Sequence, residues 1–90
     1  MERIYMEELY QLIEEKIQAA GYPGKIDGGE FYADVSAEAE HQELGTYIFI
    51  IKKSDTLSYK GCMTIMEDQF DLHYVDIHDG DKEYHVDFDA

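Results

Sequence analysis

The fold is decided by a stretch that begins Thr46-Tyr-Ile-Phe-Ile-Ile-Lys-Lys53 and continues through three further runs at 57–66, 69–78 and 83–89. β-branched and aromatic residues are frequent in these runs, and apolar and polar residues alternate along much of them. Turn-forming residues separate the runs, as in Asp79-Gly80-Asp81 before the last one. The pattern predicts four consecutive antiparallel strands joined as a meander.

The four runs differ in the faces that they would bury. The first run is apolar on both faces, so we expect it at the centre of the sheet. In the third run Phe70, Leu72 and Tyr74 share one face whereas Val75 and Ile77 lie on the other, which indicates a bulge or a strand covered on both sides. The last run alternates, with Tyr84, Val86 and Phe88 facing inward and Glu83, His85, Asp87 and Asp89 facing outward.

The N-terminal forty residues predict helices. In the first twenty, apolar side chains recur at steps of three and four, at Tyr5, Leu9, Leu12, Ile13, Ile17 and Ala20. Gly21 can adopt the left-handed conformation that ends a helix and Pro23 cannot continue one, so this helix should end near Ala20. Residues 30–40 fit either a helical stripe or a strand alternation, but their many Ala and Glu residues favour a short second helix.

Length and composition predict one domain, residues 1–90, because a chain of 90 residues with 44% hydrophobic residues can build one core and not two. We expect an α+β fold, with one or two N-terminal helices packed on one face of a four-stranded antiparallel sheet. The other face would be left to solvent, self-association or a partner. A lone cysteine, Cys62, and the absence of a signal peptide or a long apolar run favour a cytoplasmic protein.

The charge is strongly negative and unevenly placed. The chain carries 21 acidic and 7 basic residues, a net charge of −14, and nine acids against one base fall between Gly61 and Ala90. Such a field repels nucleic acids and anionic membranes and speeds association with basic surfaces. We therefore expect a basic protein surface as the partner, with no direct binding to nucleic acid or membrane. The alternative is that the acidic surface serves only solubility.

The acidic residues of the C-terminal third form the predicted partner-binding site. Alternate residues on a strand lie about 6.7 Å apart, so acids on one strand can form a ladder of negative charge. Nucleic acid presents phosphates at an axial step of about 3.4 Å per strand, so such a ladder would match roughly every second phosphate. The candidate residues are Glu67, Asp71, Asp76, Asp79, Asp81, Glu83, Asp87 and Asp89.

Residues that could support catalysis or metal binding are few. The densest group of potential metal ligands is His73, Asp76, His78, Asp79 and His85. On an unbroken strand His73 and His78 would face opposite sides, and only a bulge could reunite them. Cys62 fits a half-buried thiol better than a nucleophile, and the chain has no phosphate-binding glycine loop and no C-x-x-C pair. We predict a protein that is not an enzyme, with no catalytic, cofactor-binding or metal-binding residues.

A general resemblance adds a functional expectation. The acidic hairpin segment Asp76-Ile-His-Asp-Gly-Asp-Lys-Glu-Tyr-His-Val-Asp-Phe-Asp89, in a chain of this length and build, resembles the small acidic inhibitors of phages and mobile elements, such as anti-CRISPR proteins. The resemblance covers general build only and matches no family motif. It implies a nucleic-acid-mimicking inhibitor of a bacterial defence nuclease or another nucleic-acid-binding enzyme.

A second function class stays open. Eight tyrosines are many for this length, and Tyr is enriched at protein interfaces. The chain could therefore be an accessory interaction module of a plasmid or prophage that binds through a tyrosine-bearing sheet face. The tyrosines considered for that face are Tyr32, Tyr47, Tyr59 and Tyr74. In either case we expect a monomer or a homodimer.

Overall fold

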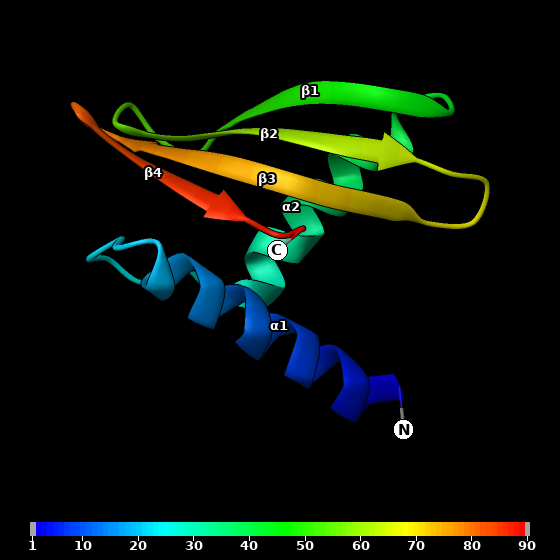
Figure 1. The fold of residues 1–90 in the computed structure, drawn as a ribbon, viewed down its shortest axis with the longest axis horizontal. Helices are drawn as coiled ribbons and strands as arrows, with labels where there is room; N and C mark the ends of the chain where they lie inside the picture. The colour runs from blue at the N-terminus through cyan, green and yellow to red at the C-terminus, as the bar shows by residue number, and fades with distance from the viewer. Residues whose placement is uncertain (1, 90) are drawn as a thin grey trace.

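The computed structural model describes residues 2–89, with side chains from Met6 onward, and confirms the predicted α+β class. Two N-terminal helices precede a four-stranded sheet: α1 (Glu2–Ala19), α2 (Gly28–Glu40), β1 (Gly45–Lys52), β2 (Leu57–Ile65), β3 (Phe70–Asp79) and β4 (Lys82–Asp87). The strand order is β1-β2-β3-β4 and each neighbouring pair is antiparallel, as predicted for a meander (Figure 1).

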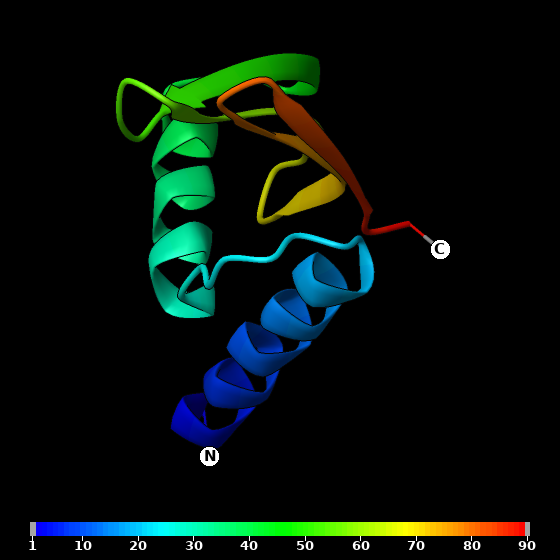
Figure 2. The same ribbon diagram turned by 90° about the vertical axis from the view of Figure 1, so that its left-hand side faces the viewer.

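Both helices lie on the same side of the sheet, and α1 diverges from it toward the N-terminus (Figure 2). The first helix ends at Ala19, and Gly21 beyond it has a φ of 95°, as its sequence position predicted. Gly28 begins α2 directly against the backbone of Tyr10 in α1, where a Cβ atom would collide with the Tyr10 carbonyl oxygen. Among residues 2–89 we find no helix with the length and apolar character needed to cross a bilayer.

The ambiguous segment 30–40 is helical. Asp27 caps α2 by accepting a hydrogen bond from the Glu30 amide at 2.9 Å. Phe31 and Val35 are buried, whereas Ala33 and Ala37, which a strand would place on the same face as them, are exposed. Tertiary burial and an N-cap therefore agree with the high helix propensity of Ala and Glu.

The core lies between the helices and one sheet face. It is built from the side chains of Ile13, Ile17, Tyr22, Ile26, Phe31, Val35, Phe49, Tyr59, Met63, Val75, Ile77 and Val86. Apart from Tyr22 and Tyr59, no side chain with a polar or charged group is buried within residues 6–89. Tyr5, which was predicted to belong to the apolar stripe of α1, lies outside the residues whose side chains are described.

The expectation that the first strand is central is wrong. β1 lies at an edge of the sheet, because a meander leaves its first and last strands without a second neighbour. Its covered face is buried through Phe49, but Ile48 and Ile50 on the other face are 54% and 66% exposed. β1 therefore has the composition of a central strand in an edge position.

The phase change in the third run is a β-bulge. Cys62 pairs with Tyr74 and Met63 pairs with Leu72, so His73 is an extra residue on β3. This insertion lets Leu72 face the core together with Val75 and Ile77, despite the odd spacing in the sequence. It also determines where the His73 side chain lies.

Candidate functional site

The candidate site is the sheet face opposite the helices, which we call the open face. Alternation and strand register place these side chains on it: Thr46, Ile48, Ile50, Lys52, Ser58, Lys60, Cys62, Thr64, Asp71, His73, Tyr74, Asp76, His78, Glu83, His85 and Asp87. On β2, for example, Lys60 is exposed on this face whereas its neighbours Tyr59 and Gly61 are buried on the other. Asp89, beyond the end of β4, joins the face through a contact with His73.

Five of the eight predicted acids gather on the open face of the β3 and β4 hairpin. They are Asp71, Asp76, Glu83, Asp87 and Asp89. Glu83 and Asp87 lie on one side of β4, which forms the second edge of the sheet. Two acids of the predicted ladder therefore lie on this edge strand, with His85 between their carboxylates.

The other three predicted acids lie elsewhere. Asp79 faces the helix side and accepts a hydrogen bond from the Tyr22 hydroxyl at 3.0 Å. Burial raises the pKa of Tyr22, and the hydrogen bond to Asp79 raises it further. Asp81 lies in the turn between β3 and β4, and Glu67 lies in the loop between β2 and β3.

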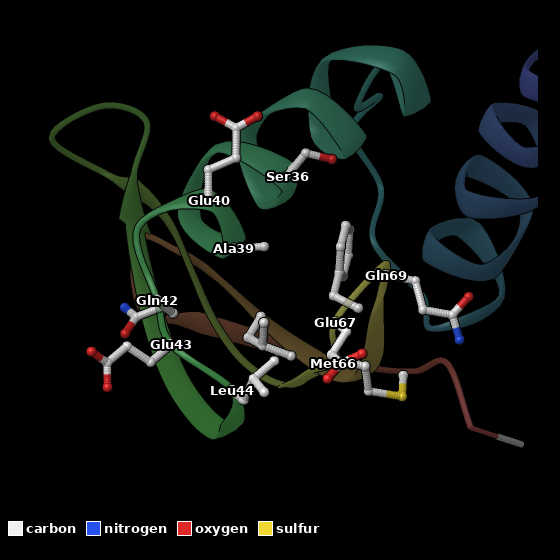
Figure 3. Close-up of a pocket in the computed structure, with 11 residues that line it drawn as sticks. Ser36, Ala39, Glu40, Gln42, Glu43, Leu44, Met66, Glu67 and Gln69 are labelled. Atoms are coloured by element: carbon white, nitrogen blue, oxygen red, sulfur yellow. The ribbon is translucent and has the colours of Figure 1, made fainter.

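Glu67 belongs to a different surface feature. It lines a shallow hollow of about 640 Å³ between the C-terminal end of α2 and the loop that joins β2 to β3 (Figure 3). Glu40 and Glu43 extend the acidic rim of this hollow, and Leu44 supplies an exposed apolar side chain. This hollow is at the opposite end of the strands from the turn that carries Asp81, so Glu67 is not part of the hairpin ladder.

Three histidines pair with acids across the hairpin, an arrangement that the sequence reasoning missed. His85 Nδ1 lies 2.5 Å from Asp76 Oδ1, and His78 Nε2 lies 3.8 Å from Glu83 Oε1. Both are directly opposed pairs on β3 and β4. The sequence contained the information needed to predict these pairs, because a two-residue turn at Gly80-Asp81 fixes which residues face each other across the hairpin.

The third pair is part of a longer chain of polar groups. His73 Nε2 lies 2.7 Å from Thr64 Oγ1, and its Nδ1 lies 2.9 Å from Asp89 Oδ2. Thr64 in turn shares a hydrogen bond of 2.9 Å with Thr46. The order of hydroxyl, imidazole and carboxylate is that of a catalytic triad.

The side chains of Thr64, His73 and Asp89 also have a structural role, because they join the C-terminal segment to the sheet. Thr64, His73 and Asp89 do not line the hollow beside Glu67, nor a second cavity between α1, α2 and the start of β3 that is lined by residues such as Leu9, Val35 and Leu72. A triad also needs donors aimed at a developing oxyanion and a site that holds the substrate. We infer that these three side chains hold the segment after β4 against the bulge. At the same place the Phe88 amide donates to the His73 carbonyl oxygen at 2.9 Å.

The histidines do not form a joint ligand set. The bulge does bring His73 to the same face as His78 and His85, as the metal interpretation would require. Each imidazole is nevertheless engaged with a separate carboxylate. Within the described part of the chain, no three His, Cys, Asp or Glu side chains are placed to hold one metal ion.

The open face thus has two chemically different halves. Along β1 and β2 it presents Ile48 and Ile50 with the ammonium groups of Lys52 and Lys60, whereas along β3 and β4 it presents carboxylates and imidazoles. Of the four tyrosines considered for this face, Tyr74 alone lies on it, since Tyr47 and Tyr59 face the helices and Tyr32 lies on α2. Comparison with protein-family models, curated proteins and solved structures finds no match to this chain.

Proposed function

We propose that the protein is a non-enzymatic binding protein that presents the acidic open face of the β3 and β4 hairpin to a basic surface of another protein. The observation that carries this proposal is the gathering of five carboxylates on one face of the hairpin, at an edge of the molecule. They belong to a chain whose net charge is −14. Such a field accelerates encounter with basic partners and repels nucleic acids.

In its most specific form, the proposal is that the hairpin occupies a nucleic-acid-binding groove and inhibits the protein that owns it. Glu83 and Asp87 on β4 are four residues apart, which is about 13 Å of strand. The phosphates of one nucleic-acid strand recur at axial steps of about 3.4 Å, so about 13 Å corresponds to about four phosphate steps. A basic groove built for phosphates can therefore contact two carboxylates that are about 13 Å apart. A bacterial defence nuclease or another nucleic-acid-binding enzyme would be a partner of this kind.

Capture from bacterial lysate tests the proposal with two matched variants. The hairpin variant combines Asp71→Asn, Glu83→Gln and Asp87→Asn, and the helix variant combines Glu7→Gln, Glu8→Gln and Glu15→Gln on α1. All six side chains are exposed and each variant removes three negative charges, so the two differ only in where the charge is lost. We expect the wild type and the helix variant to retain a basic nucleic-acid-binding protein, released by about 0.5 M salt because salt screens exposed charges.

Inhibition is tested on the retained protein itself. Labelled DNA or RNA bound to that protein should be displaced by the wild type and not by the hairpin variant. Equal capture by both variants would contradict a site on the hairpin. Capture without displacement of nucleic acid would contradict the inhibitor form of the proposal.

The alternative of an interaction module that binds through a tyrosine-bearing sheet face has less support. It would depend on Tyr74, whose ring centroid lies 5.4 Å from that of His85 within the acidic half of the open face. A Tyr74→Ala variant that weakened capture more than the hairpin variant would favour this alternative.

A further inference from the structure

The unpaired edge of β1 is unusual for an exposed strand. Residues 47–51 are an uninterrupted apolar run, which is typical of strands buried on both faces in the interior of a sheet. The strand is eight residues long, contains no proline, and pairs with β2 in one unbroken register without a bulge. Proteins usually shorten, bend or charge an exposed edge to prevent pairing with another strand.

The register identifies the backbone groups that this edge presents. The Lys53 amide donates to the Leu57 carbonyl oxygen at 2.9 Å, so odd-numbered residues of β1 make the hydrogen bonds to β2. The even-numbered residues then direct their amide and carbonyl groups away from the sheet. These residues are Thr46, Ile48, Ile50 and Lys52.

The other edge of the sheet is protected. β4 has six residues, and by the same alternation its outward backbone groups belong to Glu83, His85 and Asp87. The Lys16 ammonium of α1 also donates to the Asp87 carbonyl oxygen at 3.4 Å. β1 is separated from α1 by the whole width of the sheet (Figure 1), and the middle of its edge, at Ile48 and Ile50, has none of these protections.

The charges that flank β1 make its two ends complementary. Glu40 and Glu43 precede the strand, and Lys52 ends it, with Asp55 three residues farther along the chain. An antiparallel copy of the same strand therefore brings its acidic end beside the basic end of the first. A parallel copy would place like charges together, so charge favours antiparallel self-pairing.

We propose that two copies of this protein pair antiparallel through β1 and form one continuous eight-stranded sheet. A two-fold axis at Phe49 sets Ile48 of each copy opposite Ile50 of the other, and Lys52 opposite Thr46. In this register residues 47–51 of the two copies lie opposite each other. Each even-numbered residue of one copy faces an even-numbered residue of the other, so the outward amide and carbonyl groups of the two strands can hydrogen-bond to each other. β1 then becomes the central strand that its composition predicts.

The dimer is compatible with the acidic site and independent of it. Because β4 is the strand farthest from β1, the two hairpins lie at opposite ends of the joined sheet. Both open faces are on the same side of that sheet, since a two-fold axis perpendicular to a sheet keeps each face on its own side. The pairing of one strand buries a small area, so we expect a dissociation constant of about 10 to 100 μM.

Sedimentation equilibrium of the purified full chain over a concentration series tests the pairing without any partner. The wild type should approach twice the monomer mass as its concentration rises. Ile50→Pro removes an outward amide without removing a hydrogen bond to β2, and it should stay monomeric. Ile50→Thr keeps that amide and changes the same exposed side chain, so it should still dimerise.

A charge exchange tests the antiparallel orientation. Lys52→Glu should weaken the dimer about tenfold, because it places acidic groups at both ends of each strand pair, and a tenfold change is about 1.4 kcal/mol. Adding Glu43→Lys restores the complementarity and the wild-type net charge, so the double variant should dimerise again. Circular dichroism of each variant shows that a loss of dimer is not a loss of fold.

Three outcomes would overturn the pairing. One is a wild type that stays monomeric at about 1 mM, well above the expected dissociation constant. Another is a dimer that withstands Ile50→Pro. The third is a monomeric wild type whose β1 edge instead binds an extended segment of a different protein. None of these outcomes bears on capture by the acidic hairpin, because the mass is measured on the isolated chain.

Discussion

The carboxylate of Asp89 lies 2.9 Å from Nδ1 of His73, which precedes it by sixteen residues. The contact exists because the bulge in β3 turns the His73 imidazole onto the open face, where Thr64 also reaches it. Next to it, the Phe88 amide is bonded to the His73 carbonyl oxygen. These contacts extend the pairing of β3 with the C-terminal segment past Asp87, the last residue of β4.

Asp89→Ala should loosen this segment without unfolding the protein. Because the Asp89 side chain is 61% exposed, we expect the free energy of unfolding to fall by less than about 1 kcal/mol. Hydrogen exchange of the Phe88 amide, followed by NMR, should nevertheless become faster. Asp81→Ala removes the same charge from the turn and serves as the control. Unchanged Phe88 exchange in Asp89→Ala would show that the contact does not hold the segment.

Gly61→Ala should destabilise the fold through overpacking. The Phe49 ring crosses directly over Gly61 on the neighbouring strand, and an added Cβ would also lie 2.8 Å from the Tyr74 carbonyl oxygen. Overpacking of this kind costs about 1 to 3 kcal/mol, measurable by urea denaturation. Cys62→Ala, on the open face of the same strand, is the control and should cost less. A Gly61→Ala variant as stable as the wild type would mean that the Phe49 ring can move aside.

Lys53 joins the end of β1 to α2, so its removal should weaken the contact between helix and sheet. Its ammonium lies 2.7 Å from Asp34 and 2.9 Å from Glu30, and these hydrogen bonds, the Asp34 bond foremost, raise the pKa of Lys53. Lys53→Met should lower the free energy of unfolding by about 1 kcal/mol, the upper range for partly exposed pairs. Lys52→Met makes the same change on the opposite face and should be neutral in dilute, monomeric solution. Equal effects of the two substitutions would contradict a stabilising link between Lys53 and α2.

The buried phenol of Tyr59 predicts a loss of stability at high pH. Burial raises the pKa of Tyr59 to about 12, from an ordinary value of 10.0. Between these values the unfolded chain loses the phenolic proton and the folded chain keeps it, so stability present below pH 10 declines as the pH rises toward 12. Tyr59→Phe should reduce the slope of unfolding free energy against pH in this window. An unchanged slope would mean that Tyr59 does not contribute.

Local patterns in the sequence were sufficient for the elements and for most faces. Gly21 and Pro23 marked the end of α1, and the phase change between Leu72 and Val75 indicated either a bulge or a strand covered on both sides, of which the structure has the bulge. The position of β1 could not be read in the same way. The apolar run of β1 indicates how much of its surface can be buried. Which strands lie beside β1 depends instead on the strand order of the sheet, which the run does not encode.

The acidic site was predicted in part. Alternation along β4 identified the open-face positions of Glu83 and Asp87. Asp79 was assigned to the site although it follows Ile77 by two residues, and this parity already places it on the covered face. The pairing of His73 with Asp89 required the bulge and the C-terminal segment together, so no single local pattern could show it.

The most direct measurement of the central claim is the salt dependence of binding between this protein and the basic protein retained from lysate. Affinity should be measured by calorimetry for the wild type, the hairpin variant and the helix variant between about 0.05 and 0.5 M salt. We predict that the hairpin variant binds more weakly and with a shallower salt dependence, while the helix variant follows the wild type. An affinity that does not change with salt concentration, or that falls equally in both variants, would contradict an acidic binding site on the hairpin.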